Sequence, residues 1–350
     1  MSDFLHDAWY VAALAPEVNR TPRAVTMLSQ DIVLYRLQDG TPVALEDACP
    51  HRKLPLSMGR LKGDAIECGY HGLTFDCSGR CIDAATQPRI PPNARVRSYP
   101  AHERYGLVWV WMGEASRARV ENIIEIPHHD DPGWHLTTGD QMRIACHYLL
   151  VVDNLLDPSH VAWVHRGSFA GAGTDNTPLQ HLDTDEGVVC SRWLLNTPPP
   201  PFYAPLVKFS GPADRLQHYE VRWPSVAINK SIYAPAGQGS PALLDPATGG
   251  PQVYRMTSYN LLTPIDQDHT LYVWLQHRNT DPANEAITRR NAEGARLAFE
   301  EDRVILEAVQ RGLARSTTPA TGLLLDRAAR RFRDGLAARI GQEAARHAAT

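Results

Sequence analysis

Two short motifs that combine cysteine with histidine constrain this chain of 350 residues more than any other feature. The first is Cys49-Pro50-His51, and the second, Cys68-Gly69-Tyr70-His71, follows after sixteen intervening residues. Thiolates and neutral imidazoles are common protein ligands of iron and zinc. Each motif offers one of each kind, so the sequence predicts one metal centre held by two loops.

The order of these ligands distinguishes between two kinds of metal centre. In a Rieske [2Fe–2S] cluster two cysteines hold one iron and two histidines hold the other, which raises the reduction potential. A structural zinc site also accepts two cysteines and two histidines, but its ligands usually come in pairs of one type. The mixed pairs favour the Rieske cluster, with zinc as the alternative. The predicted ligands are Cys49, His51, Cys68 and His71.

Length and composition predict a globular protein with two domains. The chain is longer than a usual single domain, with 43% hydrophobic and 21% charged residues. A net charge of −4 gives no reason to expect a nucleic-acid partner. No apolar run approaches the ~18 residues that span a membrane, and no secretory signal is recognisable. The cysteines show no disulfide framework, so we expect a cytoplasmic protein.

Local patterns predict an α+β fold. Residues 1–115 alternate short apolar runs with turn signals such as Asp39-Gly40 and Ser78-Gly79, as expected for an all-β Rieske domain. Residues 116–142, which are rich in proline and aspartate, are expected to form a linker. Residues 143–350 predict a catalytic domain in which an antiparallel sheet is flanked by helices, with two final helices near 285–311 and 326–346.

The segment 153–165 carries more polar side chains than a buried helix normally tolerates. On an ideal helix five of them share an arc of about 140°: Asp153, Asn154, Asp157, His160 and His165. Unpaired ionisable groups are costly to bury, so this arc indicates a functional site. Because the two histidines lie five residues apart, a break near Pro158 is needed to bring their rings together.

Two histidines and one carboxylate form the facial triad of non-haem Fe(II) oxygenases. A buried histidine pair or a zinc site is the alternative. Asp157 lies between the two histidines and is better placed to accept a hydrogen bond from a ligand imidazole. The triad carboxylate must therefore come from elsewhere, and Asp302 can point inward from the predicted helix 285–311. An acidic triplet such as Glu300-Glu301-Asp302 is, however, also typical of a solvated helix face.

Together, and in this order, the two sites resemble those of the oxygenase components of Rieske non-haem iron oxygenases, especially vanillate and dicamba O-demethylases. The resemblance covers nearly the whole chain. It implies that His160, His165 and Asp302 bind a mononuclear Fe(II), and that Asp157, beside Asn154, passes electrons from the cluster to this iron. It rests on residues 8–12, 49–52, 68–73, 103–111 and 153–157.

The resemblance also implies an activity and partners. O2 is the co-substrate, and a small aromatic substrate is oxidised by O-demethylation or by methyl or ring hydroxylation, with ring dihydroxylation as an alternative. The sequence lacks a dinucleotide fingerprint and a plant-type ferredoxin motif, so a separate NAD(P)H-dependent flavin/ferredoxin reductase is expected. The family forms α3 homo-oligomers, in which the cluster of one subunit reduces the iron of its neighbour. A non-catalytic Rieske electron carrier is the alternative of a different class.

Candidate substrate contacts fall in the less regular region before the final helices. By resemblance to dicamba O-demethylase, Asn229 and Asn260 occupy pocket positions. A carboxylated substrate would need a cation, and the candidates are Lys208, Lys230 and Arg255, although each of them could equally be a surface charge. Side chains alternate along a strand, so Asn229 and Lys230 should face opposite sides of the sheet.

Overall fold

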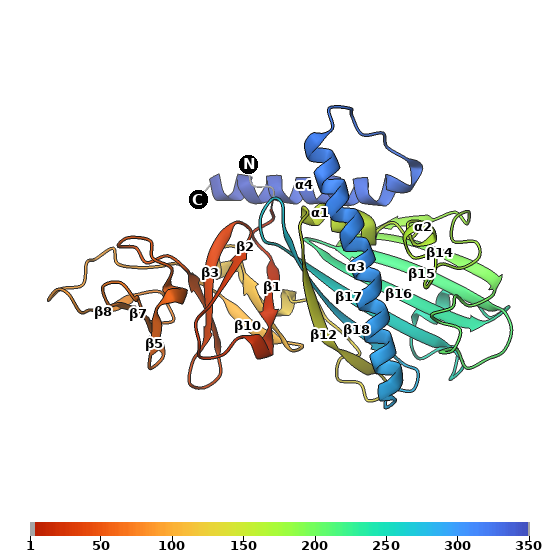
Figure 1. Cartoon of the computed structure of the whole chain (residues 1–350), viewed down its shortest axis with the longest axis horizontal. Helices are drawn as coiled ribbons and strands as arrows, with labels where there is room; N and C mark the ends of the chain where they lie inside the picture. The colour runs from red at the N-terminus through yellow and green to blue at the C-terminus, as the bar shows by residue number, and fades with distance from the viewer. Residues whose placement is uncertain (1–3, 349–350) are drawn as a thin grey trace. The chain divides into compact units, whose positions relative to one another are not determined.

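The computed structural model describes residues 4–348, which form two compact units (Figure 1). The first unit contains the described residues up to Glu125, together with Thr263–Gln267 and the residues from Glu343 onward. The second unit contains Ile126–Leu262 and Asp268–Gln342. The α+β class predicted from the sequence is confirmed, because the first unit is built from strands and the second combines a sheet with helices.

Three small antiparallel sheets make up the described part of the first unit. One has the strand order β1-β11-β10, another β2-β3-β4-β9, and the third β5-β6-β7-β8. The strands are β1 (Trp9–Leu14), β2 (Arg23–Met27), β3 (Gln30–Arg36), β4 (Pro42–Glu46), β5 (Arg60–Lys62), β6 (Ala65–Glu67), β7 (Leu73–Phe75), β8 (Cys81–Ala84), β9 (Ser98–Tyr99), β10 (Ala101–Arg104) and β11 (Leu107–Trp111). Short 3₁₀ turns, including η2 (Leu56–Met58), connect some of them.

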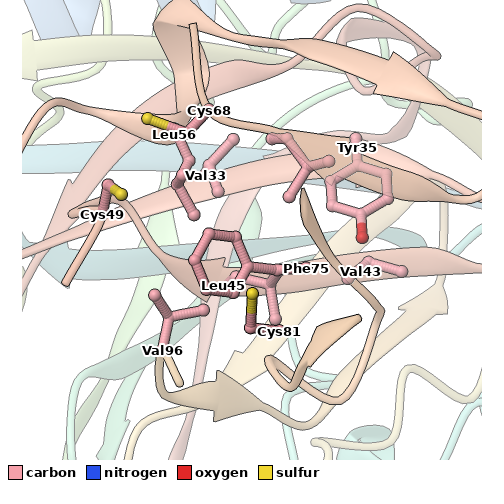
Figure 2. Packing of buried hydrophobic residues seen from close by; sticks show 11 residues of the cluster. Val33, Tyr35, Val43, Leu45, Cys49, Leu56, Cys68, Phe75, Cys81 and Val96 are labelled. Atoms are coloured by element: carbon pink, nitrogen blue, oxygen red, sulfur yellow. The ribbon is translucent and has the colours of Figure 1, made fainter. Parts of the chain in front are cut away.

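The buried core of the first unit includes the cysteines of both metal motifs (Figure 2). Cys49 and Cys68 are 2% and 3% exposed and pack with Leu56, Ile66 and Phe75. Burial of these apolar side chains stabilises the unit and fixes the two loops that carry the cysteines. Cys81 also lies in this core, and all six cysteines are free thiols.

A seven-stranded antiparallel sheet is the centre of the second unit, with the order β12-β18-β17-β16-β15-β14-β13. The strands are β12 (His135–Ile144), β13 (Gln180–Asp183), β14 (Gly187–Thr197), β15 (Ala213–Arg222), β16 (Val226–Pro235), β17 (Tyr254–Pro264) and β18 (Thr270–Arg278). β12 occupies the end of the segment 116–142, so the predicted linker is wrong for those residues. Its sequence, HLTTGDQMRI, is mostly polar and shows no apolar alternation.

Four α-helices complete the second unit: α1 (Tyr148–Leu155), α2 (Val161–Val164), α3 (Glu285–Arg315) and α4 (Arg327–Ala348), which continues into the first unit. α3 lies across one face of the sheet (Figure 1). Its buried side chains recur every three or four positions, namely Asn291, Ala295, Ala298, Asp302 and Leu306. Asp302 is thus part of the inward stripe of an amphipathic helix. No helix among residues 4–348 is long and apolar enough to cross a membrane.

The segment 153–165 is not one continuous helix. α1 ends at Leu155, and α2 begins at Val161 after a turn that contains Pro158. The break predicted near Pro158 is therefore confirmed, whereas the single polar arc predicted for an unbroken helix is wrong. Asp153, a member of that arc, pairs with Arg333 of α4 and not with His160 or His165.

Candidate active site

Two loops of similar geometry carry the predicted cluster ligands. In the first loop the N–H of Lys53 donates to the carbonyl of Cys49 at 2.8 Å, and in the second the N–H of Gly72 donates to that of Cys68 at 3.1 Å. Lys53 and Gly72, each four residues after a cysteine, both have the left-handed backbone, with φ of 59° and 73°. Each loop folds back on its cysteine, which leaves the following histidine nearer to solvent.

The four predicted cluster ligands form a pair of thiols and a pair of imidazoles. The rings of His51 and His71 lie 4.6 Å apart, and the buried Nδ1 of His71 has no hydrogen-bond partner. Burial raises the pKa of Cys49 to about 11, and the neighbouring thiol of Cys68 contributes to the rise. Such a thiol is neutral without a metal and would ionise on binding one. The donor set therefore fits a metal centre.

A single zinc ion would require all four ligand atoms to surround one point. Within the described residues, three side chains have potential ligand atoms that all lie within 4.8 Å of one another, but these are His160, His165 and Asp302 and not the Cys/His set. The Cys/His set is spread more widely than the roughly 4 Å between ligand atoms of a tetrahedral zinc site. A two-iron cluster accounts for this spread, because each pair of ligands binds its own iron.

The side chain of Asp47 fixes the first loop. Its carboxylate is buried and accepts hydrogen bonds from the N–H of Ser57 at 2.7 Å and from the Ser57 hydroxyl at 2.6 Å. Replacing Asp47 with alanine leaves the Ser57 N–H unpaired, and we expect a loss of about 1–3 kcal/mol. Thermal unfolding followed by the visible absorption of the cluster measures this loss. Asp39→Ala, which removes an exposed turn contact with Thr41, is the control.

The second candidate metal site consists of His160, His165 and Asp302. Nε2 of His160 and Nε2 of His165 lie 3.5 and 3.3 Å from Oδ1 of Asp302. The two imidazole rings are 5.3 Å apart at an angle of 73°. His160 is the N-cap of the short helix α2, and His165 is its C-cap, where the backbone leaves the helical conformation. All three groups aim one ligand atom at a common point, as a facial triad requires.

Neighbouring groups hold the three side chains in place. Nδ1 of His165 contacts Oε2 of Glu301 at 2.7 Å, Nδ1 of His160 contacts the main-chain carbonyl of Asp157, and Nδ2 of Asn154 donates to Oδ1 of Asp302 at 3.1 Å. These contacts leave Nε2 of both histidines free to bind a metal. The Asp157 carboxylate, predicted from the sequence for this role, instead accepts a hydrogen bond from the N–H of Ser159.

The electrostatics of this site favour a cation. Burial lowers the pKa of His165, but hydrogen bonds and charge from Asp302 and Glu301 outweigh burial and hold its pKa above the usual value. The same negative field that stabilises a proton on His165 stabilises a metal ion. The donor set, two imidazoles and one carboxylate, is suited to Fe(II).

A cavity of about 100 Å³ opens beside the triad. Its walls combine apolar side chains, including Val161, Phe169, Met256 and Phe299, with a comparable number of polar and charged ones. An apolar cavity of about 150 Å³ can accept benzene. The cavity beside the triad is smaller than this but is not fully enclosed, and its aromatic and aliphatic groups suit a substrate with a single ring.

The predicted pocket residues Asn229 and Asn260 both line this cavity. Nδ2 of Asn260 donates to Oδ1 of Asn229 at 2.8 Å, and the hydroxyl of Tyr272 donates to Oδ1 of Asn260 at 2.9 Å. Lys230 faces the opposite side of the sheet, where it lines a second cavity of about 220 Å³, so the predicted alternation is confirmed. Asn229 and Asn260 are thus held in position by hydrogen bonds to each other and to Tyr272.

The three predicted cations do not line the cavity beside the triad. Lys208 forms an exposed ion pair with Asp281. Arg255 lies with Lys230 at the second cavity, and its guanidinium donates to the main-chain carbonyls of Leu243, Asp245 and Thr248. Arg215 of β15, a buried arginine that no sequence pattern singled out, does line the cavity beside the triad.

Comparison with known proteins agrees with this geometry. Residues 8–100 match the Rieske [2Fe-2S] domain, and residues 144–342 match the vanillate O-demethylase oxygenase C-terminal domain. The chain is 36% identical to the toluene-4-sulfonate monooxygenase system iron–sulfur subunit of Comamonas testosteroni, over 89% of each chain. It is 32% identical to the vanillate O-demethylase oxygenase subunit of a Pseudomonas species, over 89% of this chain and 87% of that one.

A solved structure shows the same architecture. The crystal structure of dicamba monooxygenase bound to 3,6-dichlorosalicylic acid aligns with a TM-score of 0.86 and 30% identity, over 98% of this chain and 99% of that one. The chain therefore belongs to the Rieske non-haem iron oxygenases of the vanillate O-demethylase type. It is an oxygenase component, with a Rieske [2Fe–2S] cluster and a mononuclear non-haem iron as cofactors. The enzyme interpretation, rather than a zinc protein or an electron carrier, is confirmed.

Proposed function

We propose that this oxygenase oxidises the methyl or methoxy group of a small aromatic acid, by methyl hydroxylation or O-demethylation. The observation that carries the proposal is a cavity for a single ring with His160, His165 and Asp302 in its wall. The relatives are named for toluene-4-sulfonate, vanillate and dicamba, which are all aromatic acids. Ring dihydroxylation is the alternative reaction.

In this proposal the four Cys/His residues of the first unit hold the cluster, and the triad of the second unit holds Fe(II). The unpaired Nδ1 of His71 and the convergence of three ligand atoms on one point support these assignments. When bound, the cluster would transfer electrons one at a time, and the ferrous iron would be the site where O2 is reduced.

The chain's own residues would orient the reacting groups and exclude water. Glu301 and the carbonyl of Asp157 fix the two imidazoles, while Asn154 fixes the Asp302 carboxylate. Phe169 and Phe299 would hold the substrate ring against the triad. Positioning of this kind accelerates a reaction because the substituent is already close to the oxidising centre when O2 arrives.

Electrons would come from a separate NAD(P)H-dependent flavin/ferredoxin reductase, in line with the relatives' description as components of larger systems. We assign a homotrimer, in which the cluster of one subunit reduces the iron of the next through Asp157. Exposed side chains beside each centre support such an interface, because Met58 and Tyr70 near the cluster and Trp163 on α2 are 69%, 55% and 65% exposed. The cytoplasmic location stays a prediction.

A substrate screen tests the proposed reaction. Methyl- and methoxy-substituted benzoates and benzenesulfonates are supplied with a surrogate reductase, and NADH consumption, hydroxylated product and formaldehyde are measured. Formaldehyde formed in proportion to NADH supports O-demethylation, whereas a benzyl alcohol supports methyl hydroxylation. A cis-dihydrodiol would instead favour ring dihydroxylation, and uncoupled NADH oxidation with every compound would contradict the proposal.

Filling the cavity should block turnover without removing the metals. Ala298 lies on the buried stripe of α3 and lines the cavity, so leucine at this position adds three carbon atoms to a small space. We expect Ala298→Leu to lower kcat/KM by at least about tenfold for a substrate identified in the screen. Iron and cluster content should not change. Leu297→Ala, on the exposed side of α3, is the matched control.

A further inference from the structure

Arg215 is a buried cation with unused donors. It lies on β15, is 3% exposed, and lines the cavity together with the triad. Its Nε and Nη1 are buried without any hydrogen-bond partner, and Nη2 donates only a long hydrogen bond of 3.4 Å to the carbonyl of Phe169. A guanidinium stays charged in proteins, and burying an uncompensated charge is costly. Arg215 therefore lacks a partner that a ligand could provide.

The protein's own groups do not account for this charge. Among residues 4–348 no carboxylate forms an ion pair with Arg215. The adjacent Asp214 accepts hydrogen bonds from the N–H groups of Asn196, Gly237 and Gly239. The rings of Tyr203 and Tyr233 lie 5.7 and 5.5 Å from the guanidinium carbon. These rings stabilise the cation through their faces, but they offer no acceptor to its N–H groups.

Arg192, another buried arginine of the same sheet, provides a comparison, because all of its hydrogen bonds are made within the protein. Its Nε donates to Gln217 at 2.7 Å, and its two terminal nitrogens donate to the carbonyls of Thr177 and Pro158. Every nitrogen of Arg192 is thus satisfied within the protein. The contrast indicates that the unpaired donors of Arg215 serve a ligand.

We infer that Arg215 binds the acid group of the substrate, so that the ligand is an aromatic monoanion such as a sulfonate or carboxylate. This inference rests on the proposed function and adds the residue that selects the substrate. Sulfonates and carboxylates share the arrangement of oxygens that a guanidinium fork recognises. The preference for an anion is a property of this end of the cavity and not of the metal site.

The position of Arg215 fits a substrate held between two ends. Phe169, whose carbonyl contacts Arg215, has its ring 6.0 Å from that of His165. Arg215 and His165 thus line the same cavity, and Phe169 lies beside both of them. An acid group bound at Arg215 would leave the ring among apolar side chains and direct the opposite substituent toward the triad.

The experiment compares anions with a neutral ligand of the same shape. Binding of 4-methylbenzenesulfonate, 4-methylbenzoate and neutral 4-methylbenzenesulfonamide is measured by titration calorimetry with the wild-type protein, Arg215→Gln, Arg215→Lys and Lys230→Gln. Lys230 is the control cation on the other face of the sheet. Thermal unfolding of each variant reports whether its fold is retained, and comparison of the two anions identifies the preferred acid.

We expect Arg215→Gln to weaken binding of the preferred anion by roughly 100-fold, because it removes a buried charge-assisted contact. Sulfonamide affinity should change by less than about threefold. Arg215→Lys should fall between, and Lys230→Gln should bind like the wild type. Equal losses for the anion and the sulfonamide, no loss in Arg215→Gln, or no anion binding to the wild type would overturn the inference. Anion binding without oxidation would contradict the proposed function alone.

Discussion

Replacing Asp302 with alanine is expected to abolish turnover and to remove one iron per chain. Oδ1 of Asp302 lies within 3.5 Å of Nε2 of both triad histidines, and two imidazoles alone hold Fe(II) poorly. We expect kcat/KM to fall by about 1,000-fold or more. Iron analysis should then find only the two irons of the cluster, while the visible absorption of the cluster stays unchanged.

A neighbouring carboxylate provides the control for this variant. Glu300 lies two residues earlier on α3 and pairs with Arg303 instead of facing the triad. Glu300→Ala should therefore keep wild-type iron content and activity within about a factor of two, since exposed ion pairs contribute little. Full iron content and normal turnover in Asp302→Ala would show that another group supplies the carboxylate.

Asp157→Asn is expected to leave both metals bound and yet stop coupled turnover. Asparagine keeps the shape of the side chain and can still accept from the N–H of Ser159, while the main-chain contact to His160 is unaffected. It loses the charge and the second carboxylate oxygen, which in the proposed trimer face the neighbouring subunit. Product formation should fall at least about 100-fold, because electrons from the cluster no longer reach the iron.

Rapid mixing of the reduced Asp157→Asn protein with O2 and substrate measures this effect directly. The cluster should stay reduced for much longer than in the wild-type protein. Asp153→Asn is the matched control, because Asp153 pairs with Arg333 rather than with the triad. Re-oxidation of the cluster at the wild-type rate, with normal product, would reject a role for Asp157 in electron transfer.

Much of the fold could be predicted from local sequence. The turn signals and apolar runs of the first 115 residues correspond to short strands, and the two final helices end within a few residues of the predicted positions. β12 was missed because its polar sequence gives no period of two, and hydrogen bonding to β18 determines its conformation. Such pairing depends on residues more than one hundred positions away.

The candidate metal sites could be predicted because their chemistry demands particular residue types. Cysteine and histidine at close spacing mark the cluster loops, and the histidine pair marks the triad. The carboxylate at Asp302 needed the family resemblance, since an acidic triplet on a helix is usually solvated. Glu301 was missed in its role beside His165 for the same reason, because spacing alone does not tell which acid of the triplet faces which histidine.

Arg215 could not be found from the sequence. β15 is buried along nearly its whole length, and polar side chains occur on both of its faces. The alternation of polar and apolar residues therefore does not reveal which face of this strand lines the cavity. Its place in the cavity wall depends on the pairing of Arg215 with Tyr233 on β16 and on its contact with the carbonyl of Phe169. Lys208, Lys230 and Arg255 have the expected charge, but each is satisfied or located elsewhere.

The most direct test of the central claim is the fate of O2 in a reconstituted reaction. The protein is supplied with a surrogate reductase, NADH, ¹⁸O2 and a methyl-substituted aromatic acid that binds to it, and the product is analysed by mass spectrometry. We predict one ¹⁸O atom in the new hydroxyl group of the product, with NADH consumed in equal amount. A product that carries oxygen from water, or NADH consumption that yields only reduced oxygen species with every acid that binds, would contradict the account.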